Sequence, residues 1–509
     1  MGIMQTIMAR LGYTPSTRRL PAGTQRTYNA AKINRLTADW TSTNLSADAT
    51  TRYALKTLRA RSRDLAENDD YARKFLHMVR TNVVGPSGIR LQSQVREPMN
   101  GNATAPGPFD TLANIKIEDA WSRWGRRGTC DVTGTLSWTD CQMLFISSVL
   151  RDGEVLIRKV RGFDNPFSYA LQFMEADHLD EDYSLDPYTN GNPVRMSVEF
   201  DAWRRPVAYH LLVKHPGDYS YMSRSGQMRE RVPASDIIHA FIPERPGQTR
   251  GVPFMVSAMT RLRNVGAYEE AAIIQARVDA SKMGIIQTPS GSEYQGDAKD
   301  ADKNLLHDVE PGVIMQLPQG WEWQQFNPTH PSGEFGPFMK ATLRGISSGL
   351  NVSYNSLASD PEGVTYATLR SMLLEDREAW RILQAWTATT LCDGVFGDWL
   401  RMALLTQELA LPPTKYAKFN APRWRARGWT WVDPQNEMNA NIAGIRAGVN
   451  SQIRVLGEQG LELEDVFQEL KEAKELAAQY GITLDLSSTG AYPTDEPSAA
   501  QETKGGTTK

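Results

Sequence analysis

The sequence predicts an α+β fold, because helical and strand-like stretches are segregated along the chain. Strand-like alternation is concentrated between residues 136 and 241, where Pro, Gly and Asp turns separate the runs. Proline-free stretches with helical spacing follow Pro253 and Thr365. With 509 residues, 40% of them hydrophobic, the chain can bury a sizeable core, and at roughly 150 residues per domain we expect about three domains.

The N-terminal half should contain helices followed by a small antiparallel β domain. Residues 1–46 are rich in Thr, Ser, Asn and Arg with weak periodicity, which is typical of an extended arm. Helical spacing runs from 47 to 81, and NVVGPSGIRLQ at 82–92 predicts a strand, a turn and a strand. We expect a helix at 115–124, and one more helix at the start of the β domain, 136–241.

The middle of the chain should contain two long helices separated by a compact insert. Pro253 suits the first position of a helix, because the N–H that it lacks would be unpaired there. This helix should reach about Lys282, a length of roughly 40 Å, and such a rod can pack sideways against neighbours. The insert should hold strands at 285–286 and 313–317 and a polar helix at 297–307.

The rest of the chain should be helical, with one turn-rich loop and a polar tail. The expected helices are 335–350, 365–391, one capped by Asp433 with Pro434 in its first turn, and 465–480. The loop at 351–363 separates the first two helices and contains a DPEG turn. Almost nothing apolar follows residue 487, which predicts a disordered tail.

Composition excludes several classes of protein. The formal net charge of −3 argues against a repressor or nucleoid protein, which grips duplex DNA through a strongly basic domain. It permits a surface that DNA slides past, since each phosphate-bound Lys or Arg would slow movement. The three cysteines form no CxxC pair, which fits packing roles in a reducing cytoplasm. No apolar run is long enough to span a bilayer, and no P-loop is present.

Residues 345–349 (GISSG) match the GxSxG pattern of hydrolases, which makes Ser347 the nucleophile of an alternative, enzymatic hypothesis. That chemistry requires a sharp strand-to-helix turn and a histidine downstream. Here the motif lies in an expected helix, and His330 is the last histidine of the chain. We therefore interpret these small residues as helix-packing positions and expect no catalytic, cofactor-binding or metal-binding residue.

Three charged groups of residues have more than one interpretation. The acidic run at 177–182 could hold a cation, but its place after a strand favours a solvated turn. His210 and His215 fall on opposite faces of an expected strand, which argues against a zinc pair. The basic residues between Arg52 and Arg63 could contact DNA, scaffold or a neighbouring subunit, although a solvated helix face is favoured.

Arg423, Arg425 and Arg427 are the clearest candidates for a binding surface. They are interleaved with Trp424 and followed by Trp429. Arginines mixed with aromatic residues are typical of nucleic-acid binding, and contacts between subunits explain the pattern equally well.

Six segments carry a resemblance to a known family. They are RYALKTLRARSRDLAENDDYARKFLHMVRTNVVGPSGIRLQ (52–92), LRDGEVLIRKV (150–160), VEFDAWRRPVAYHLLVKHPGD (198–218), IIHAFIPERPGQTRGVPFM (237–255), LNVSYNSLASDPEGVTYATLRSMLLEDR (350–377) and WVDPQNEMNANIAGIRAGVNS (431–451). Together they resemble the lambda-type family of bacteriophage portal proteins, in family order, over most of residues 50–480.

The resemblance implies a portal fold with a mixed α/β wing, long stem helices, a small α/β clip and a helical crown. Its parts would be an N-terminal arm (1–46), wing (47–251), first stem helix (252–284), clip (285–332), second stem helix (333–350), tunnel-loop region (351–364), long wing helix and return (365–428), crown (429–486) and disordered tail (487–509). The tunnel loop would comprise Ala358, Ser359, Asp360, Pro361, Glu362 and Gly363. Its two carboxylates would either repel DNA phosphates or only shape a turn.

The resemblance also implies a dodecameric ring with no enzymatic activity and no cofactor, made in the host cytoplasm and built into one capsid vertex of the virion. Double-stranded DNA would pass through its channel. The ring would contact the major capsid and scaffold proteins and dock the terminase large subunit, then head–tail connector or tail proteins, and no membrane. A monomeric nucleic-acid adaptor is the remaining alternative.

Overall fold

A computed structural model describes residues 35, 41, 43–97, 107–186, 191–218, 228–280, 284–287, 298–299, 305–306, 322–325, 335–429, 433–459, 461 and 463–480. The chain divides into two units, Met1–Ser46 and Ala47–Lys509, and the fold described below is that of the second. This unit is mixed α+β, mostly helical with small antiparallel sheets, as the sequence predicts. Most of the predicted arm and all of the predicted tail lie outside the described residues. Within the described part of the chain, no helix has both the length and the apolar character needed to cross a membrane.

The first helical stretch is broken where the sequence predicts continuity. Its helices are α2 (Ala47–Arg52), α3 (Leu55–Asn68) and α4 (Asp70–Val79). Asp69 has an extended backbone, and its side chain accepts a hydrogen bond from a backbone N–H in the first turn of α4, so it caps that helix. A π-helical turn, Arg80–Val84, ends at Gly85 with a φ of 70°. The strand predicted at 82–84 is therefore wrong, because its buried valines continue the helix, and only β1 (Arg90–Ser93) forms.

Helices α5 (Thr111–Trp124) and α6 (Trp138–Asp152) form where the sequence predicts them. Together with α11 (Asp393–Leu405) they enclose an aromatic centre around Trp121. The Trp121 ring contacts those of Trp124, Trp138, Phe396 and Trp399, with centroids 4.8 to 5.6 Å apart. All five side chains are buried, so these rings supply much of the apolar area that holds the three helices together.

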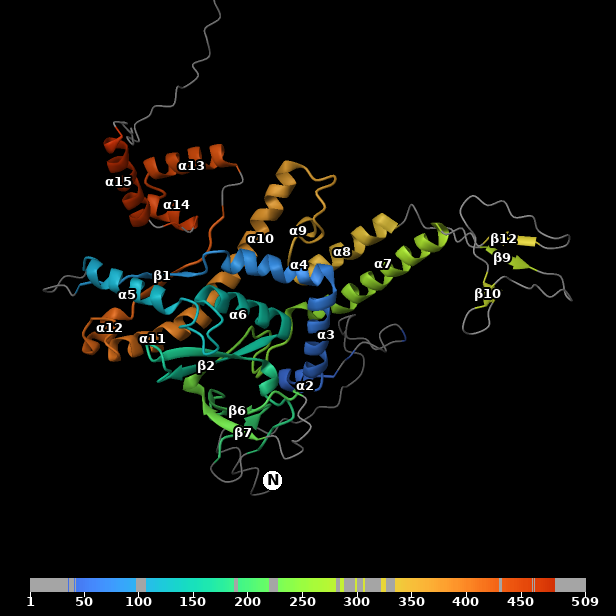
Figure 1. The fold of residues 1–509 in the computed structure, drawn as a ribbon, viewed down its shortest axis with the longest axis horizontal. Helices are drawn as coiled ribbons and strands as arrows, with labels where there is room; N and C mark the ends of the chain where they lie inside the picture. The colour runs from blue at the N-terminus through green and yellow to red at the C-terminus, as the bar shows by residue number, and fades with distance from the viewer. Residues whose placement is uncertain are drawn as a thin grey trace, which may run out of the picture. The chain divides into compact units, whose positions relative to one another are not determined.

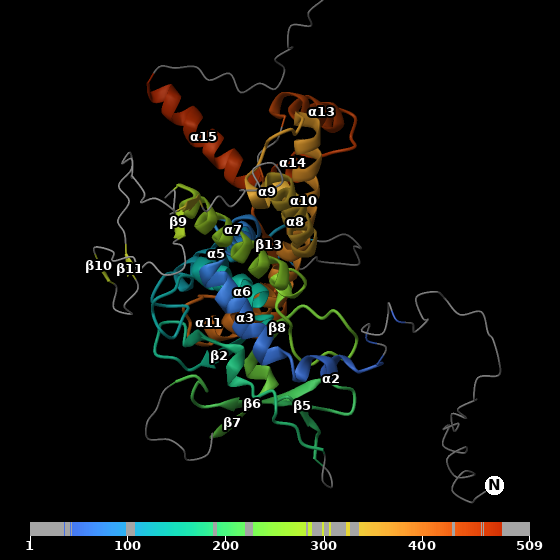
Figure 2. The same ribbon diagram turned by 90° about the vertical axis from the view of Figure 1, so that its right-hand side faces the viewer.

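The single β domain predicted for 136–241 is divided into two antiparallel sheets. Their strands are β2 (Glu154–Arg161), β3 (Tyr169–Met174) and β8 (Ile237–Phe241) in the order β3–β2–β8, and β4 (Val194–Arg195), β5 (Val198–Phe200), β6 (Pro206–Leu212) and β7 (Arg229–Pro233) in the order β4–β5–β6–β7. Val155 and Ile157 of β2 join the main core, whereas Leu156 packs with the four-stranded sheet. Figures 1 and 2 both show β2 lying between α6 and strands β6 and β7.

The two long helices predicted in the middle of the chain are α7 (Met259–Ala280) and α8 (Phe335–Leu350). Helix α7 begins later than expected, because Pro253 precedes a 3₁₀ turn instead. Tyr268 stacks on Phe335 with ring centroids 5.5 Å apart, and at the other end Ser257 Oγ donates to the Gly349 carbonyl at 3.1 Å. The helices are therefore antiparallel neighbours, which run side by side in Figure 1.

The insert between these helices is built from two short strand pairs. Strand β9 (Gly284–Gln287), expected at 285–286, pairs antiparallel with β12 (Glu322–Gln325), which brings the two ends of the insert together. Strands β10 (Ala298–Lys299) and β11 (Leu305–Leu306) also pair. The prediction of a polar helix at 297–307 is therefore wrong. Its two leucines, Leu305 and Leu306, are adjacent in the sequence and do not have the spacing of one helical face. The strand predicted at 313–317 lies outside the described residues.

The C-terminal part is helical apart from one strand. Its elements are α9 (Tyr354–Ala358), α10 (Tyr366–Thr387), a π-helical turn (Ala388–Cys392), α11, α12 (Tyr416–Phe419), β13 (Pro422–Arg425), α13 (Pro434–Arg446), α14 (Gln452–Glu458) and α15 (Leu463–Gln479). Asp433 caps α13 as predicted. Strand β13 pairs antiparallel with β1, with Arg425 opposite Arg90. This pairing joins β13, which carries two of the three predicted arginines, to the strand that follows the N-terminal helices.

Candidate nucleic-acid interface

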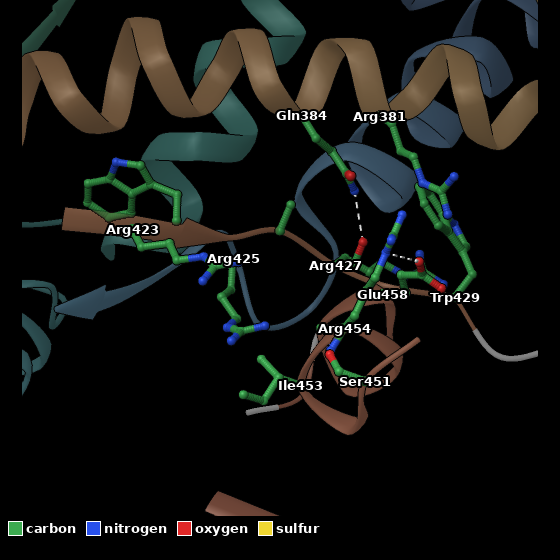
Figure 3. Close-up of a pocket in the computed structure, with 13 residues that line it drawn as sticks. Arg381, Gln384, Arg423, Arg425, Arg427, Trp429, Ser451, Ile453, Arg454 and Glu458 are labelled. Atoms are coloured by element: carbon green, nitrogen blue, oxygen red, sulfur yellow. Dashed lines mark hydrogen bonds and ion pairs between the residues drawn. The ribbon is translucent and has the colours of Figure 1, made fainter. Parts of the chain in front are cut away.

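An open hollow of about 440 Å³ lies where α10, β13 and α14 meet (Figure 3). Its lining is dominated by arginines, namely Arg381, Arg423, Arg425, Arg427 and Arg454. Glu458 is the one carboxylate among the described residues that line it. The three arginines predicted from sequence are therefore brought together, and two more join them. We call this feature the arginine hollow.

Contacts to distant segments fix two of these arginines. Arg425 is 8% exposed, and its Nε donates to Gln92 Oε1 of β1 at 3.0 Å. The Arg427 guanidinium donates to the Thr81 carbonyl, and the Arg427 carbonyl accepts from Gln384 Nε2 at 3.0 Å. The backbone after β13 is thus held between the π-helical turn Arg80–Val84 and α10. The guanidinium groups of Arg425 and Arg427 are therefore ordered before any ligand binds.

The other three arginines lie on the open side of the hollow. Arg423 is exposed, and the Arg381 and Arg454 side chains are 48% and 71% exposed. Arg454 Nε lies 3.7 Å from Glu458 Oε1, and both partners face solvent, so this pair adds little stability. Sequence reasoning missed Arg381 and Arg454, because nothing in their local spacing separates them from ordinary surface positions.

Positive charge also accumulates next to the hollow, at Trp429. The guanidinium carbons of Arg377 and Arg381 each lie 5.8 Å from the centre of its ring. Burial lowers the pKa of Arg377, and the charges of Arg381 and Arg427 lower it further against the opposing effect of Glu437. Like charges therefore destabilise one another here, and an added anion would relieve that repulsion.

The predicted tunnel-loop residues lie at the junction of α8, α9 and α10, and Ala358 is the last residue of α9 rather than part of a loop. Ser359 and Gly363 have φ values of 54° and 72°, which turn the chain back towards α10. Lys340 Nζ of α8 lies 2.7 Å from Glu362 Oε2 and 3.4 Å from Asp360 Oδ2.

Hydrogen bonds anchor this segment on both sides. The Tyr354 hydroxyl donates to Asp360 Oδ2 at 2.7 Å, and this bond, with Lys340, lowers the pKa of the Asp360 carboxyl. Asp376 of α10 is 8% exposed and accepts from the Ser353 backbone N–H at 2.8 Å and from the Ser353 hydroxyl at 2.6 Å. The two loop carboxylates are therefore partly neutralised within the chain, which weakens their expected repulsion of DNA.

Among the basic residues between Arg52 and Arg63, Lys56 and Arg61 are exposed as the sequence favours, whereas Arg59 and Arg63 take part in ion pairs within the fold. Arg59 is 1% exposed and contacts Glu154 Oε1 at 2.9 Å and Glu181 Oε1 at 3.1 Å. Arg63 contacts Asp152 Oδ1 at 2.8 Å and Asp177 Oδ2 at 2.6 Å. The solvated interpretation is wrong for both arginines, because α3 packs on α6 and on the turn after β3.

Glu154 is the centre of this ionic cluster. It is fully buried and also contacts Arg250 Nη2 at 2.6 Å and His239 Nε2 at 2.8 Å. Burial alone would raise its pKa, but the Arg250 charge and the His239 hydrogen bond hold the pKa of Glu154 well below its usual range. Arg250 also donates to the Leu179, Met196 and Ala176 carbonyls at 3.1 to 3.3 Å. We call Arg59, Arg63, Arg250, Glu154 and their partners the buried ionic cluster.

Two residues of the acidic run at 177–182, Asp177 and Glu181, belong to this cluster, so the interpretation as a solvated turn is wrong for these two. Glu175, Asp177 and His215 are close enough for their ligand atoms to share an ion, yet Arg63 Nη2 already lies 2.6 Å from Asp177 Oδ2. His215 contacts Glu175, and His210 contacts Glu199 instead. The two histidines therefore have different carboxylate partners.

The GISSG motif lies inside α8, on the side that faces α7. A methyl group on Gly349 would lie 3.5 Å from the Ala258 Cβ, and one on Gly345 would lie 2.6 Å from an Arg261 nitrogen. Ser347 is 3% exposed and lies within a helix rather than at a strand-to-helix turn. The motif therefore serves helix packing. The three cysteines are also buried, as expected for packing residues.

Comparisons with known proteins were made by sequence and by structure. Residues 34–384, more than half of the chain, match the family described as "Phage portal protein, lambda family". The "Probable portal protein" of Halomonas phage phiHAP-1 is 34% identical over 459 residues, which cover 88% of this chain and 86% of that protein. "Portal protein B" of Escherichia phage lambda is 20% identical over 455 residues, covering 82% and 84%. A solved structure titled "Neck of empty GTA particle computed with C6 symmetry" has a TM-score of 0.43 at 13% identity and covers 83% of this chain and 97% of that one.

Proposed function

The chain belongs to the lambda family of phage portal proteins, and from this premise we propose that its copies close into a ring whose central channel passes double-stranded DNA at one capsid vertex. As a portal protein it is a structural component of the virion and not an enzyme. The hydrolase alternative has no support, since Ser347 is buried inside a helix.

The observation that carries the proposal is the α7–α8 pair. The two helices pack against each other, but the outer half of α7 is exposed, including Ile273 at 56% and Ile274 at 51%. Phe338 of α8 is 51% exposed as well. Exposed aliphatic and aromatic residues on a helical rod support packing against other copies, because water is a poor environment for them. Head-to-tail repetition of one such interface closes into a ring when each interface rotates the next copy by a fixed fraction of a turn, as we propose for this chain.

In this proposal the parts of the chain keep the boundaries implied by the resemblance. Residues 252–284 and 333–350 form the stem around the channel, and residues 285–332 form the clip. The β9–β12 pair joins the two ends of the insert. This supports a clip whose chain leaves the stem and returns to it at the same place. The wing would comprise 47–251 and 365–428, and the crown 429–486.

The remaining assignments concern DNA and partners. Ala358–Gly363 would be the tunnel loop facing the DNA, held by Lys340 until a contact with DNA or a neighbouring copy displaces it. The clip would dock the terminase large subunit, and later head–tail connector or tail proteins. Capsid and scaffold proteins would surround a ring of roughly twelve copies.

Light scattering on the purified full-length protein tests the assembly. We expect a particle mass roughly twelve times that of the 56.9 kDa chain. The variant Ile273→Asp/Ile274→Asp should remain folded but shift the mass to the monomer, because it places charges in the stem interface. Val213→Asp, which charges an equally exposed aliphatic residue at the end of β6, is the matched control and should assemble. A native protein that is monomeric at every concentration would refute the ring and favour the adaptor alternative.

A further inference from the structure

We propose that the arginine hollow is a binding site for the phosphodiester backbone of duplex DNA, so that each copy grips DNA at the crown side of the wing as well as surrounding it in the channel. This inference rests on the proposed function, because it assigns a second DNA contact to the same particle. It makes Arg423 and Arg425 ligands of phosphate rather than of a neighbouring subunit.

The balance of charges in the hollow favours a polyanion. Five guanidinium groups line the hollow, and Glu458 is the one carboxylate among its described lining residues. Arg381 also pairs with Glu378 of its own helix, which leaves at least three more guanidinium groups than carboxylates. The chain as a whole has a net charge of −3, so this excess of cations is local. A single docked carboxylate would leave most of the excess positive charge unneutralised. Duplex DNA presents about one negative charge per 1.7 Å of its axis and can neutralise several guanidinium groups at once.

The chemistry and the order of the donors favour phosphate in particular. A guanidinium offers a planar fork of N–H groups that matches two phosphate oxygens. Arg425 is held by Gln92 and Arg427 by the Thr81 carbonyl, so both donors lose little further freedom on binding. Arg423 and Arg425 are two residues apart on β13, which places them on the same face of the strand.

The hollow is open to solvent. Arg381, Arg423 and Arg454 are exposed, so a phosphate backbone that approaches the surface can reach their guanidinium groups. The Arg454–Glu458 contact of 3.7 Å is weak enough for a phosphate to replace. The repulsion among Arg377, Arg381 and Arg427 is relieved by any anion that enters. Contacts to phosphates alone carry no sequence information, so we expect binding without sequence preference.

The test uses native full-length protein and a short fluorescent duplex, with affinity measured by anisotropy at several salt concentrations. The variant Arg381→Gln/Arg423→Gln/Arg454→Gln removes three exposed charges without touching the two ordered arginines. If each of the three binds one phosphate, the slope of log affinity against log salt should fall by about 0.9 for each arginine replaced, or about 2.7 in total. At low salt the variant should bind more than about tenfold more weakly.

The matched control is Lys56→Gln/Arg61→Gln/Arg205→Gln, which removes the same charge from exposed positions away from the hollow and should keep the native slope. Native affinity and slope in the hollow variant would overturn the proposal. So would a hollow variant whose copies no longer assemble by light scattering, because the arginines would then hold carboxylates of a neighbouring subunit. If the native protein forms no rings at all, the proposed function fails, while the comparison of the two variants still decides whether the hollow binds DNA.

Discussion

Arginines gather in two regions of this protein, and the two differ in where their counter-charges come from. In the buried ionic cluster, Arg59 and Arg250 are almost completely buried and both contact Glu154. In the arginine hollow, guanidinium groups outnumber carboxylates, and most of them face solvent. The first region completes its ion pairs within the fold and connects α3, β2 and the segment around Arg250 that precedes α7. In the second region two exposed carboxylates, Glu378 and Glu458, pair with Arg381 and Arg454, and the guanidinium groups still outnumber them.

Removing the central carboxylate of the buried cluster should have the largest effect. Glu154→Gln keeps the shape of the side chain but leaves two buried guanidinium groups without their shared counter-charge. Breaking a buried ion pair in this way costs about 3–5 kcal/mol. We expect a corresponding drop in the urea midpoint of unfolding. Glu230→Gln, which breaks an exposed pair with Arg158, should cost less than about 1 kcal/mol, and equal losses in the two variants would show that burial does not distinguish these pairs.

Acid should weaken both the buried ionic cluster and the separate Glu199–Arg231 pair. The pKa of Glu154 lies below its usual range, and the Arg231 hydrogen bond lowers the pKa of Glu199 to about 2. A carboxylate with a depressed folded pKa stabilises the fold fully above its unfolded pKa of about 4.3, and this stability is lost as the pH falls below that value. Thermal unfolding followed from pH 7 downwards should show a falling melting temperature below about pH 4.3.

The Glu154→Gln variant sharpens this prediction, since it lacks the titrating group and should lose less stability between neutral and acid pH than the native protein. The Arg381→Gln/Arg423→Gln/Arg454→Gln variant should keep the native acid profile. The pairs of Arg381 with Glu378 and of Arg454 with Glu458 are exposed and contribute little stability, so a strongly altered acid profile in the hollow variant would mean that its arginines make structural ion pairs.

The same hollow variant should have the smallest effect on stability. Its three side chains are exposed, so we expect a change below about 1 kcal/mol in the free energy of unfolding. The sign should be neutral or stabilising, because the substitutions reduce repulsion among the remaining arginines. Urea unfolding checks this, and a loss comparable to that of Glu154→Gln would place the hollow among the structural clusters.

Sequence reasoning predicted the elements whose signals are local. The helices α8, α13 and α15 follow from periodicity and capping residues, and strand β2 follows from alternation. The family followed from six ordered segments. Sequence reasoning missed the break at Asp69, because the helical spacing of apolar residues continues on both sides of it. In the structure the Asp69 side chain caps a new helix at this point.

The arginines show why the rest could not be predicted. Arg59 and Arg425 have similar sequence surroundings, since each has another arginine two positions away. Their roles differ because Arg59 meets Glu154 and Arg425 meets Gln92, partners 95 and 333 residues distant. Such pairings are decided by tertiary packing, for example by the β1–β13 pair, and no local pattern encodes them.

Electron microscopy of the purified full-length protein tests the central claim most directly. We expect rings of a single subunit type, with a central hole wide enough for a duplex and the α7–α8 pairs surrounding it. Compact particles of one or two copies, without a hole under any condition, would contradict the proposed channel.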